Sequence, residues 1–130
     1  MKPYYEEDGI TIYHGDCREV LLELKNVGAI LTDPPYGNKT EYASFEDSRQ
    51  ELRQTISRQV IGRMIQEASR VAITCGVANI WLYPEPTWTL CWHTPAGVGS
   101  GPWGFCCWQP VLVYGKDPYL EYERTHGGNR

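Results

Sequence analysis

The feature that most limits how this chain can fold is a long stretch that carries no basic residue. Residues 71–115 contain no Lys or Arg, their single acidic residue is Glu85, and all five tryptophans of the chain lie among them. The residues before this stretch carry both charges, and no linker rich in Gly, Pro or Ser separates the two parts. We therefore expect one domain, in which a charged surface helix leads into a buried, uncharged sheet.

Length and net charge exclude several classes of protein. The chain has 130 residues, enough for one domain with a real core, and a net charge of −4. This charge excludes a basic protein that coats nucleic acid, although it permits a local basic groove. The sequence contains no apolar run near the roughly 18 residues that span a bilayer, and its first residues resemble no signal peptide. We expect a cytoplasmic protein without a membrane segment.

The five cysteines and three histidines form no pattern that is typical of a metal site. The number of cysteines is odd, and the sequence has neither C-x-x-C nor H-E-x-x-H. We therefore expect buried free thiols and no metal ion. The tryptophans are expected in the core and in the wall of a pocket.

Hydrophobic periodicity predicts strands that alternate with helices. Ser48 and Glu51 form a capping-box pattern that opens the clearest helix, about 48–70, whose apolar residues recur four positions apart. Pro110 lies within a long predicted strand and indicates a sheet edge or a bulge. The alternation predicts an α/β fold whose sheet is mostly parallel at its centre and ends in an antiparallel strand. The other predicted elements are strands at 10–14, 29–32, 71–75, 90–94 and 105–114, a helix at 17–24, a polar mobile segment at 38–47, a Gly- and Pro-rich loop at 96–104 and a frayed tail at 120–130.

A short motif directly after the predicted strand 29–32 carries chemical information. Asp33 supplies a carboxylate, Pro34 a carbonyl without a competing N–H, and Pro35 fixes the backbone and removes another donor. Tyr36 adds an aromatic face on which a base can stack. The segment is thus a rigid set of acceptors, which suits a planar amine with two hydrogens. The alternative interpretation is a proline-rich turn with a capping Asp.

The segment Ile30–Gly37 resembles the catalytic motif of the DNA amino-methyltransferases, which form N6-methyladenine or N4-methylcytosine from S-adenosylmethionine. Two further parts of the chain are similar to this family. His14–Cys17, followed by a predicted helix, resembles the segment that contacts the adenosine of the cofactor. Trp103–Phe105 and Trp108–Lys116 resemble the strand near the base pocket in phage and plasmid members. The similar features run from about residue 10 to residue 119.

The resemblance implies that Asp33, Pro34, Pro35 and Tyr36 are catalytic. Asp33 and the carbonyl of Pro34 would accept the two hydrogens of the exocyclic amine and direct its lone pair at the methyl group. Tyr36 would stack on the target base after that base has flipped out of the duplex. For Asp16, which the resemblance places at the cofactor, a helix N-cap is the alternative interpretation. The implied binding residues are Asp16, Cys17 and Asp33 for S-adenosylmethionine, and Tyr36, Asn38 and Lys39 for DNA.

One part of the family pattern has no counterpart in this sequence. The Gly-rich F-x-G-x-G segment, which wraps the methionine part of the cofactor, is not found, and Gly97–Gly101 lacks the flanking residues. The resemblance therefore implies a partial Rossmann-like methyltransferase sheet and a single, incomplete domain over residues 1–130. A second chain or a homo-oligomer would complete its cofactor site.

We expect a site-specific DNA methyltransferase that acts on N6 of adenine, and several alternatives remain open. The chain could be an inactive or split-enzyme remnant that binds DNA or a partner. It could also methylate N4 of cytosine, or a planar amine of RNA or of a side-chain amide.

Overall fold

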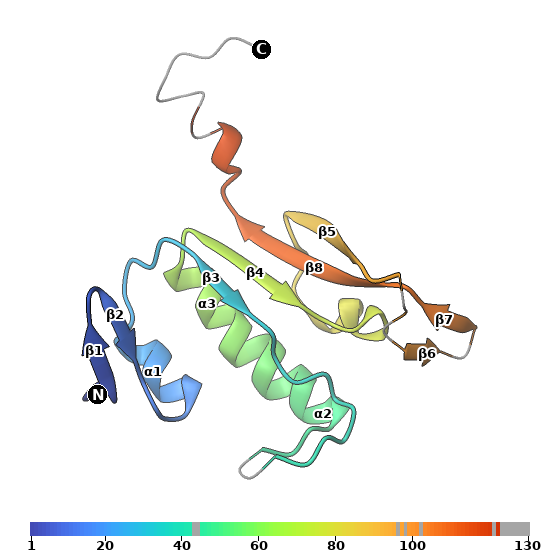
Figure 1. The fold of residues 1–130 in the computed structure, drawn as a ribbon, viewed down its shortest axis with the longest axis horizontal. Helices are drawn as coiled ribbons and strands as arrows, with labels where there is room; N and C mark the ends of the chain where they lie inside the picture. Colours follow the sequence, from blue (N-terminus) through green and yellow to red (C-terminus); the bar gives the residue numbers. More distant parts are fainter. Residues whose placement is uncertain (43–44, 96, 98, 102, 121, 123–130) are drawn as a thin grey trace.

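The largest sheet has four strands in the order β3-β4-β8-β5 (Figure 1). A computed structural model describes residues 1–42, 45–95, 97, 99–101, 103–120 and 122. β3 (Ile30–Thr32) runs parallel to β4 (Arg70–Thr74), β4 pairs antiparallel with β8 (Trp108–Gly115), and β8 pairs antiparallel with β5 (Trp88–His93).

The fold is therefore mixed α/β, as the alternation of elements predicts. The predicted mostly parallel centre is wrong, because the two central strands, β4 and β8, run antiparallel. Parallel neighbours need a long crossover, usually a helix. Such a helix joins β3 to β4, whereas the described residues between β5 and β8 form a short hairpin, made of β6 (Gly99–Gly101) and β7 (Gly104–Cys106).

A long helix connects β3 to β4 in three segments that follow one another without a break: α2 (Arg49–Glu51), η1 (Leu52–Ile61) and α3 (Gly62–Glu67). Ser48 is its N-cap, and the Ser48 hydroxyl accepts the backbone N–H of Glu51 at 3.2 Å, which confirms the predicted start. The helix ends at Glu67, earlier than the predicted residue 70, because the backbone is already extended at Ala68.

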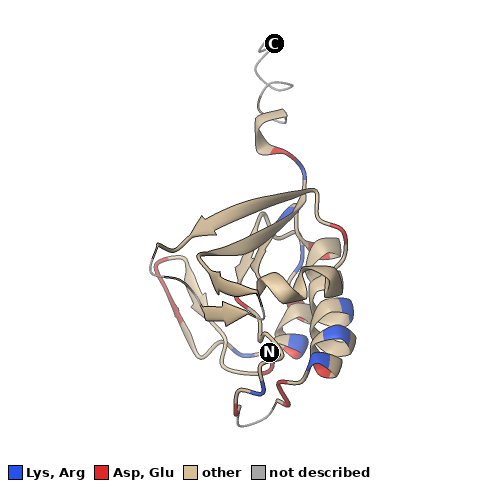
Figure 2. Cartoon of the chain, turned by 90° about the vertical axis from the view of Figure 1, so that its right-hand side faces the viewer, with Lys and Arg blue, Asp and Glu red and all other residues tan. Residues whose placement is uncertain are grey.

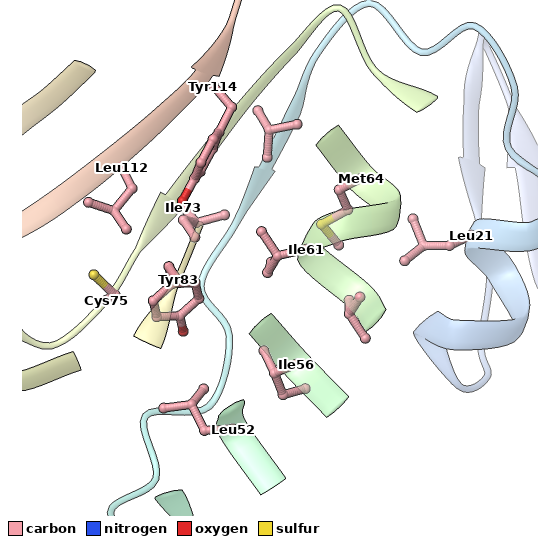
Figure 3. Close-up of a cluster of buried hydrophobic side chains, with 12 residues drawn as sticks. Leu21, Leu52, Ile56, Ile61, Met64, Ile73, Cys75, Tyr83, Leu112 and Tyr114 are labelled. Carbon is pink, nitrogen blue, oxygen red and sulfur yellow. The ribbon is translucent and has the colours of Figure 1, made fainter. Parts of the chain in front are cut away.

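The core lies between this helix and one face of the sheet (Figure 3). Ile73 of β4 and Leu112 of β8 are completely buried, and their strand neighbours alternate between the helix and the opposite face. η1 is π-helical, so its buried face is broader than the predicted stripe and includes Thr55 and Ser57. The buried apolar residues of the helix are Leu52, Ile56, Val60, Ile61 and Met64.

The opposite face of the sheet stays open to solvent in the described part of the chain. Leu31, Trp88 and Leu90 are 81%, 68% and 50% exposed. The prediction of core tryptophans is therefore wrong, because four of them are more than half exposed and Trp108 is half-buried. The prediction that tryptophans line a pocket wall is confirmed for Trp103 and Trp108. Strands without charged residues predict a sheet that is buried on both faces, whereas the long helix covers only one face of this sheet.

The cysteines also differ from the expectation of buried thiols. Cys75 is buried, whereas Cys17, Cys91 and Cys107 are exposed; all five are free. None of the helices in the described ranges has the length and apolar character needed to cross a membrane.

The predicted strand 10–14 is only partly confirmed, because it belongs to a separate hairpin and not to the main sheet. β1 (Tyr5–Glu7) pairs with β2 (Ile10–Ile12) through a two-residue turn. Asp8 and Gly9 both have positive φ, +49° and +80°, as a type I′ turn requires. The hairpin precedes α1 (Cys17–Glu23), which confirms the predicted helix 17–24.

Pro110 lies neither at a sheet edge nor in a bulge, contrary to the prediction, because β8 lies between β4 and β5 and pairs with both in a regular register. Its carbonyl accepts the N–H of Cys75, which comes directly after β4. The N–H that proline lacks would therefore lie just past the end of the β4–β8 pairing. No hydrogen bond between the two strands is lost within that pairing. The predicted strand 105–114 is divided into β7 and β8, and Ala96, Val98 and Pro102 of the predicted loop 96–104 lie outside the described residues.

Figure 2 shows that basic residues gather on the helices. Arg53 and Arg58 are exposed on the long helix, and Arg63 pairs with Glu67 at 2.9 Å. The surface of the helix is therefore charged, whereas the sheet it covers is almost free of charge.

We predict that Gly115→Ala destabilises the fold by more than about 2 kcal/mol. Gly115 has φ +99° and pairs with Arg70 at the end of β8, and a Cβ there would lie 2.1 Å from the carbonyl oxygen of Ser69. Urea unfolding measures the change in the free energy of unfolding.

Gly62→Ala is the matched control. Gly62 lies within the helix, and a Cβ there would meet no atom within 4 Å. We expect this variant to be more stable than wild type by about 0.5–1 kcal/mol. Equal stability of the two variants would contradict this account of Gly115.

Candidate functional site

The motif residues Asp33–Tyr36 lie at the end of the sheet where three strands meet. β3 and β4 are parallel and both end here, and the antiparallel β8 begins here. Ligands of open α/β sheets bind outside the carboxyl ends of the strands. This geometry brings Thr74, the last residue of β4, and Gln109, near the start of β8, to the motif.

Hydrogen bonds hold the carboxylate of Asp33 in a defined orientation. The hydroxyl of Tyr36 donates to Asp33 Oδ1 at 2.7 Å, and the hydroxyl of Thr74 donates to the same oxygen. Both of these donors use Oδ1, and the Asp33 residue is exposed. The carboxylate therefore presents Oδ2 as an acceptor for an incoming N–H.

Gln109 extends this network on the far side of Tyr36. Its side-chain oxygen lies 3.2 Å from the hydroxyl of Tyr36. A phenol has a single proton, and the shorter distance assigns that proton to Asp33. Gln109 Oε1 is therefore the second, weaker acceptor of the Tyr36 hydroxyl.

Tyr36 is held as a neutral donor. Burial raises the pKa of its hydroxyl to about 12, and the hydrogen bond to Asp33 acts in the same direction, whereas Thr74 opposes it. The side-chain amide of Asn79, which is 5% exposed, donates to the backbone carbonyl of Tyr36 at 2.6 Å. Both the ring and the backbone of this residue are therefore fixed.

Asp47 organises the loop that follows the motif. This carboxylate is 3% exposed and accepts the backbone N–H groups of Gly37, Asn38 and Thr40 at 2.6, 2.9 and 3.0 Å. Burial alone would raise the pKa of Asp47, but these N–H groups outweigh it and hold the pKa below its ordinary value. The predicted mobile segment 38–47 is thus anchored at both ends, and its residues 43–44 lie outside the described part.

Two cavities lie beside the motif. The larger, of about 690 Å³, is lined by Tyr36 together with residues 76–79 after β4, the β6–β7 hairpin and the start of β8. The smaller, of about 400 Å³, is lined by Pro35, by His14–Arg18 and by the buried face of η1. The two volumes fall in the range of small-molecule sites. Pro35 and Tyr36, which are adjacent in the motif, therefore line one cavity each.

The structure brings two predicted cofactor residues, Asp16 and Cys17, to the smaller cavity with Pro35. Asp33 is not among the described residues that line it. Asp16 is also the N-cap of α1: its carboxylate accepts the backbone N–H of Arg18 at 2.9 Å and pairs with the Arg18 guanidinium. These bonds lower the pKa of Asp16 to about 2. The N-cap interpretation is confirmed, and the cofactor contact stays a prediction.

The predicted DNA residues separate into two groups. Tyr36 and Asn38 line the larger cavity, as does Arg49 at the start of the helix. Lys39 lines a different hollow with residues of the 40–48 segment. The exposed Arg53 and Arg58 line neither of the two cavities beside the motif in the described structure.

Several residues of this site were not predicted from the sequence. Thr74 has a recognisable signal, because it is a polar residue at the end of an apolar strand. Gln109 lies within the segment Trp108–Lys116, which resembles the strand near a base pocket. Asn79 and Asp47 have no comparable signal, because they hold backbone groups that only the folded chain brings to them.

We predict that Asp47→Asn lowers the free energy of unfolding by about 1–3 kcal/mol near pH 7, because three backbone N–H groups lose a charged acceptor. Since the folded pKa is lowered, the contribution of Asp47 is present above the unfolded pKa of about 3.9 and is lost as the pH falls through the folded pKa. The difference in the free energy of unfolding between wild type and variant, measured by urea titration, should therefore become smaller from about pH 7 down to about pH 3.

Glu46→Gln is the control, because Glu46 is the exposed acidic neighbour. It should change stability little at either pH. If the free energies of unfolding of wild type and Asp47→Asn differed by the same amount at every pH, the charge of Asp47 would not be what holds the loop.

Comparison with known proteins adds no family assignment to this geometry. Neither a scan against models of known protein families nor a search of curated protein sequences gave a significant match. Function is therefore inferred from the residues and cavities of the chain itself.

Proposed function

We propose that this chain is the catalytic part of an S-adenosylmethionine-dependent DNA methyltransferase that acts on N6 of adenine. The observation that carries the proposal is that Pro35 and Tyr36 each line a different cavity, directly after the oriented carboxylate of Asp33. A methyl transfer from a cofactor to a base needs a site for each of them and a group that positions the nucleophile. The proposal includes a partial Rossmann-like sheet, and the parallel pair β3–β4 with its connecting helix supports it.

The smaller cavity suits the adenosine half of the cofactor. It joins an ionised carboxylate, Asp16, to the apolar side chains of Ile56 and Val60. When bound there, S-adenosylmethionine supplies an electrophilic methyl group. Partial desolvation of its sulfur and the charge of Asp16 raise the pKa of Cys17, although the residue as a whole is exposed.

The chain's own residues would act on the amine of the target base. That amine is a poor nucleophile, because its lone pair is conjugated with the ring. Asp33 Oδ2 and the carbonyl of Pro34 accept one hydrogen each, which favours a more tetrahedral nitrogen and directs its lone pair. Tyr36 stacks on the base in the larger cavity; its hydroxyl is held by the bond to Gln109, and its backbone carbonyl by the bond from Asn79.

The part of the cofactor site that holds the methionine end is proposed to come from a second chain or from another copy of this one. The chain has no F-x-G-x-G segment, and the residues that line the smaller cavity include only one glycine, Gly15. A weak affinity for S-adenosylmethionine in the isolated chain is therefore expected.

We predict that Asp33→Ala lowers methyl transfer at least about 10²- to 10³-fold, because it removes the acceptor that orients the amine. The measurement is transfer of a tritiated methyl group from S-adenosylmethionine to DNA, with substrates that offer adenine or cytosine as the only amine-bearing target. Binding of S-adenosylmethionine, followed by titration calorimetry, should change much less, since Asp33 does not line the smaller cavity.

Asp117→Ala provides the matched control, since Asp117 is also an exposed carboxylate but lies after β8, away from the motif. Circular dichroism checks that each variant is folded. A variant Asp33→Ala that still methylates DNA at the wild-type rate would refute the site. A wild-type chain that neither binds the cofactor nor transfers a methyl group would favour a DNA- or partner-binding module.

A further inference from the structure

The β6–β7 hairpin holds two aromatic side chains almost entirely in water. Trp103 is fully exposed and Phe105 is 91% exposed. Both lie on a two-stranded hairpin whose strands are Gly99–Gly101 and Gly104–Cys106. Large apolar rings favour burial, so two neighbouring rings without cover indicate a surface that binds something.

The position of these rings restricts what they can bind. Trp103 and Phe105 line the larger cavity, and so do Tyr36 from the loop after β3 and Trp108 from β8. Four aromatic residues from three parts of the chain therefore surround one space. Figure 1 shows the hairpin at the outer end of the sheet, beyond the start of β8. The ligand must offer flat faces that reach from Tyr36 outward to the hairpin.

The charge around this cavity differs from the charge of the whole chain. The chain has a net charge of −4. Among the described residues that line the cavity there is no Asp or Glu, and Arg49 is the only Lys or Arg. The side chain of Arg49 lies 3.4 Å from the carbonyl oxygen of Ala78, at the same cavity. A ligand with flat rings and an anionic group is thus complementary to it.

We propose that the β6–β7 hairpin is a stacking arm for unpaired DNA next to the target base: Trp103 and Phe105 stack on flanking bases, and Arg49 faces a phosphate. This inference rests on the proposed action on DNA. Stacking requires bases that are not already stacked in a duplex, and it tolerates any base because every base has a flat face. Since residues 71–115 contain no Lys or Arg, stacking contributes most of the affinity and phosphate contacts contribute little.

The test measures binding of a fluorescein-labelled single-stranded DNA of about twelve nucleotides by anisotropy, without cofactor. Each stacked base is expected to contribute about 5- to 150-fold in affinity, so Trp103→Ala and Phe105→Ala should each weaken binding by a factor in this range. The same sequence as a duplex should bind more weakly than the single strand. Trp81→Ala is the matched control, because Trp81 is 87% exposed but does not line the cavity; it should leave binding unchanged.

The dependence on salt tests the role of Arg49. Arg49→Gln should reduce the slope of log K against log salt by about 0.7, the contribution of one phosphate contact on a single strand. Arg53→Gln is its control, since Arg53 is exposed on the same helix and does not line the cavity. An equal slope in both variants would refute the phosphate contact.

Three results would overturn the stacking arm, and each can be told apart from failure of the proposed methyl transfer. Unchanged binding by Trp103→Ala and Phe105→Ala overturns it, and so does a wild-type chain that binds no single-stranded DNA. Sedimentation that shows a dimer in wild type and a monomer in Trp103→Ala assigns the hairpin to a second copy instead. Methyl transfer that depends on Asp33 would stand in all three cases.

Discussion

The pairing of β8 with β4 is the contact on which both the fold and the site depend. It brings residues after 107 against residues 70–74, so that Leu112 and Tyr114 join Ile73 in the core under the helix. The same register places Gln109 beyond the end of β4, beside the Asp33–Tyr36 segment. A shift by one residue would turn Leu112 to the open face and Gln109 away from Tyr36 at the same time. The packing of Leu112 and Tyr114 in the core therefore also fixes the position of Gln109 at the site.

The stretch 71–115, which carries a single charged residue, contributes side chains to both faces of the sheet, but the long helix covers only one face. On the covered face, alternate residues of β4 and β8 are buried. On the other face, and along the whole of β5, side chains such as Trp88 and Trp92 remain exposed. Edge strands of soluble proteins usually carry a charge or a proline that blocks further pairing, and β5 has neither. The sequence constraint that makes the core possible thus also leaves an apolar surface.

Local patterns of the sequence were good predictors where the local chain decides the structure. The capping box at Ser48 and the helix 17–24 are confirmed because each depends on neighbouring residues. The edge or bulge position of Pro110 and the burial of the tryptophans were predicted wrongly, because both depend on which strands pair and on which face of the sheet is covered. Asp47 could not be recognised, since its partners are backbone N–H groups and have no side-chain signature. At the site, Asp33 and Tyr36 follow from a local motif, whereas Thr74 and Gln109 follow from strand pairing.

The two prolines of the motif place acceptors between Asp33 and Tyr36 with no competing backbone donor. Neither Pro34 nor Pro35 has a backbone N–H, so this pair offers only its carbonyl oxygens for hydrogen bonding. Tyr36 and Thr74 occupy Oδ1 of Asp33 and fix the direction of Oδ2. An amine with two hydrogens satisfies both Oδ2 and a proline carbonyl, whereas a hydroxyl has one hydrogen and leaves one acceptor without a partner. The proposed preference for amines therefore follows from the number of hydrogens they donate, and it needs no contact with the rest of the proposed base.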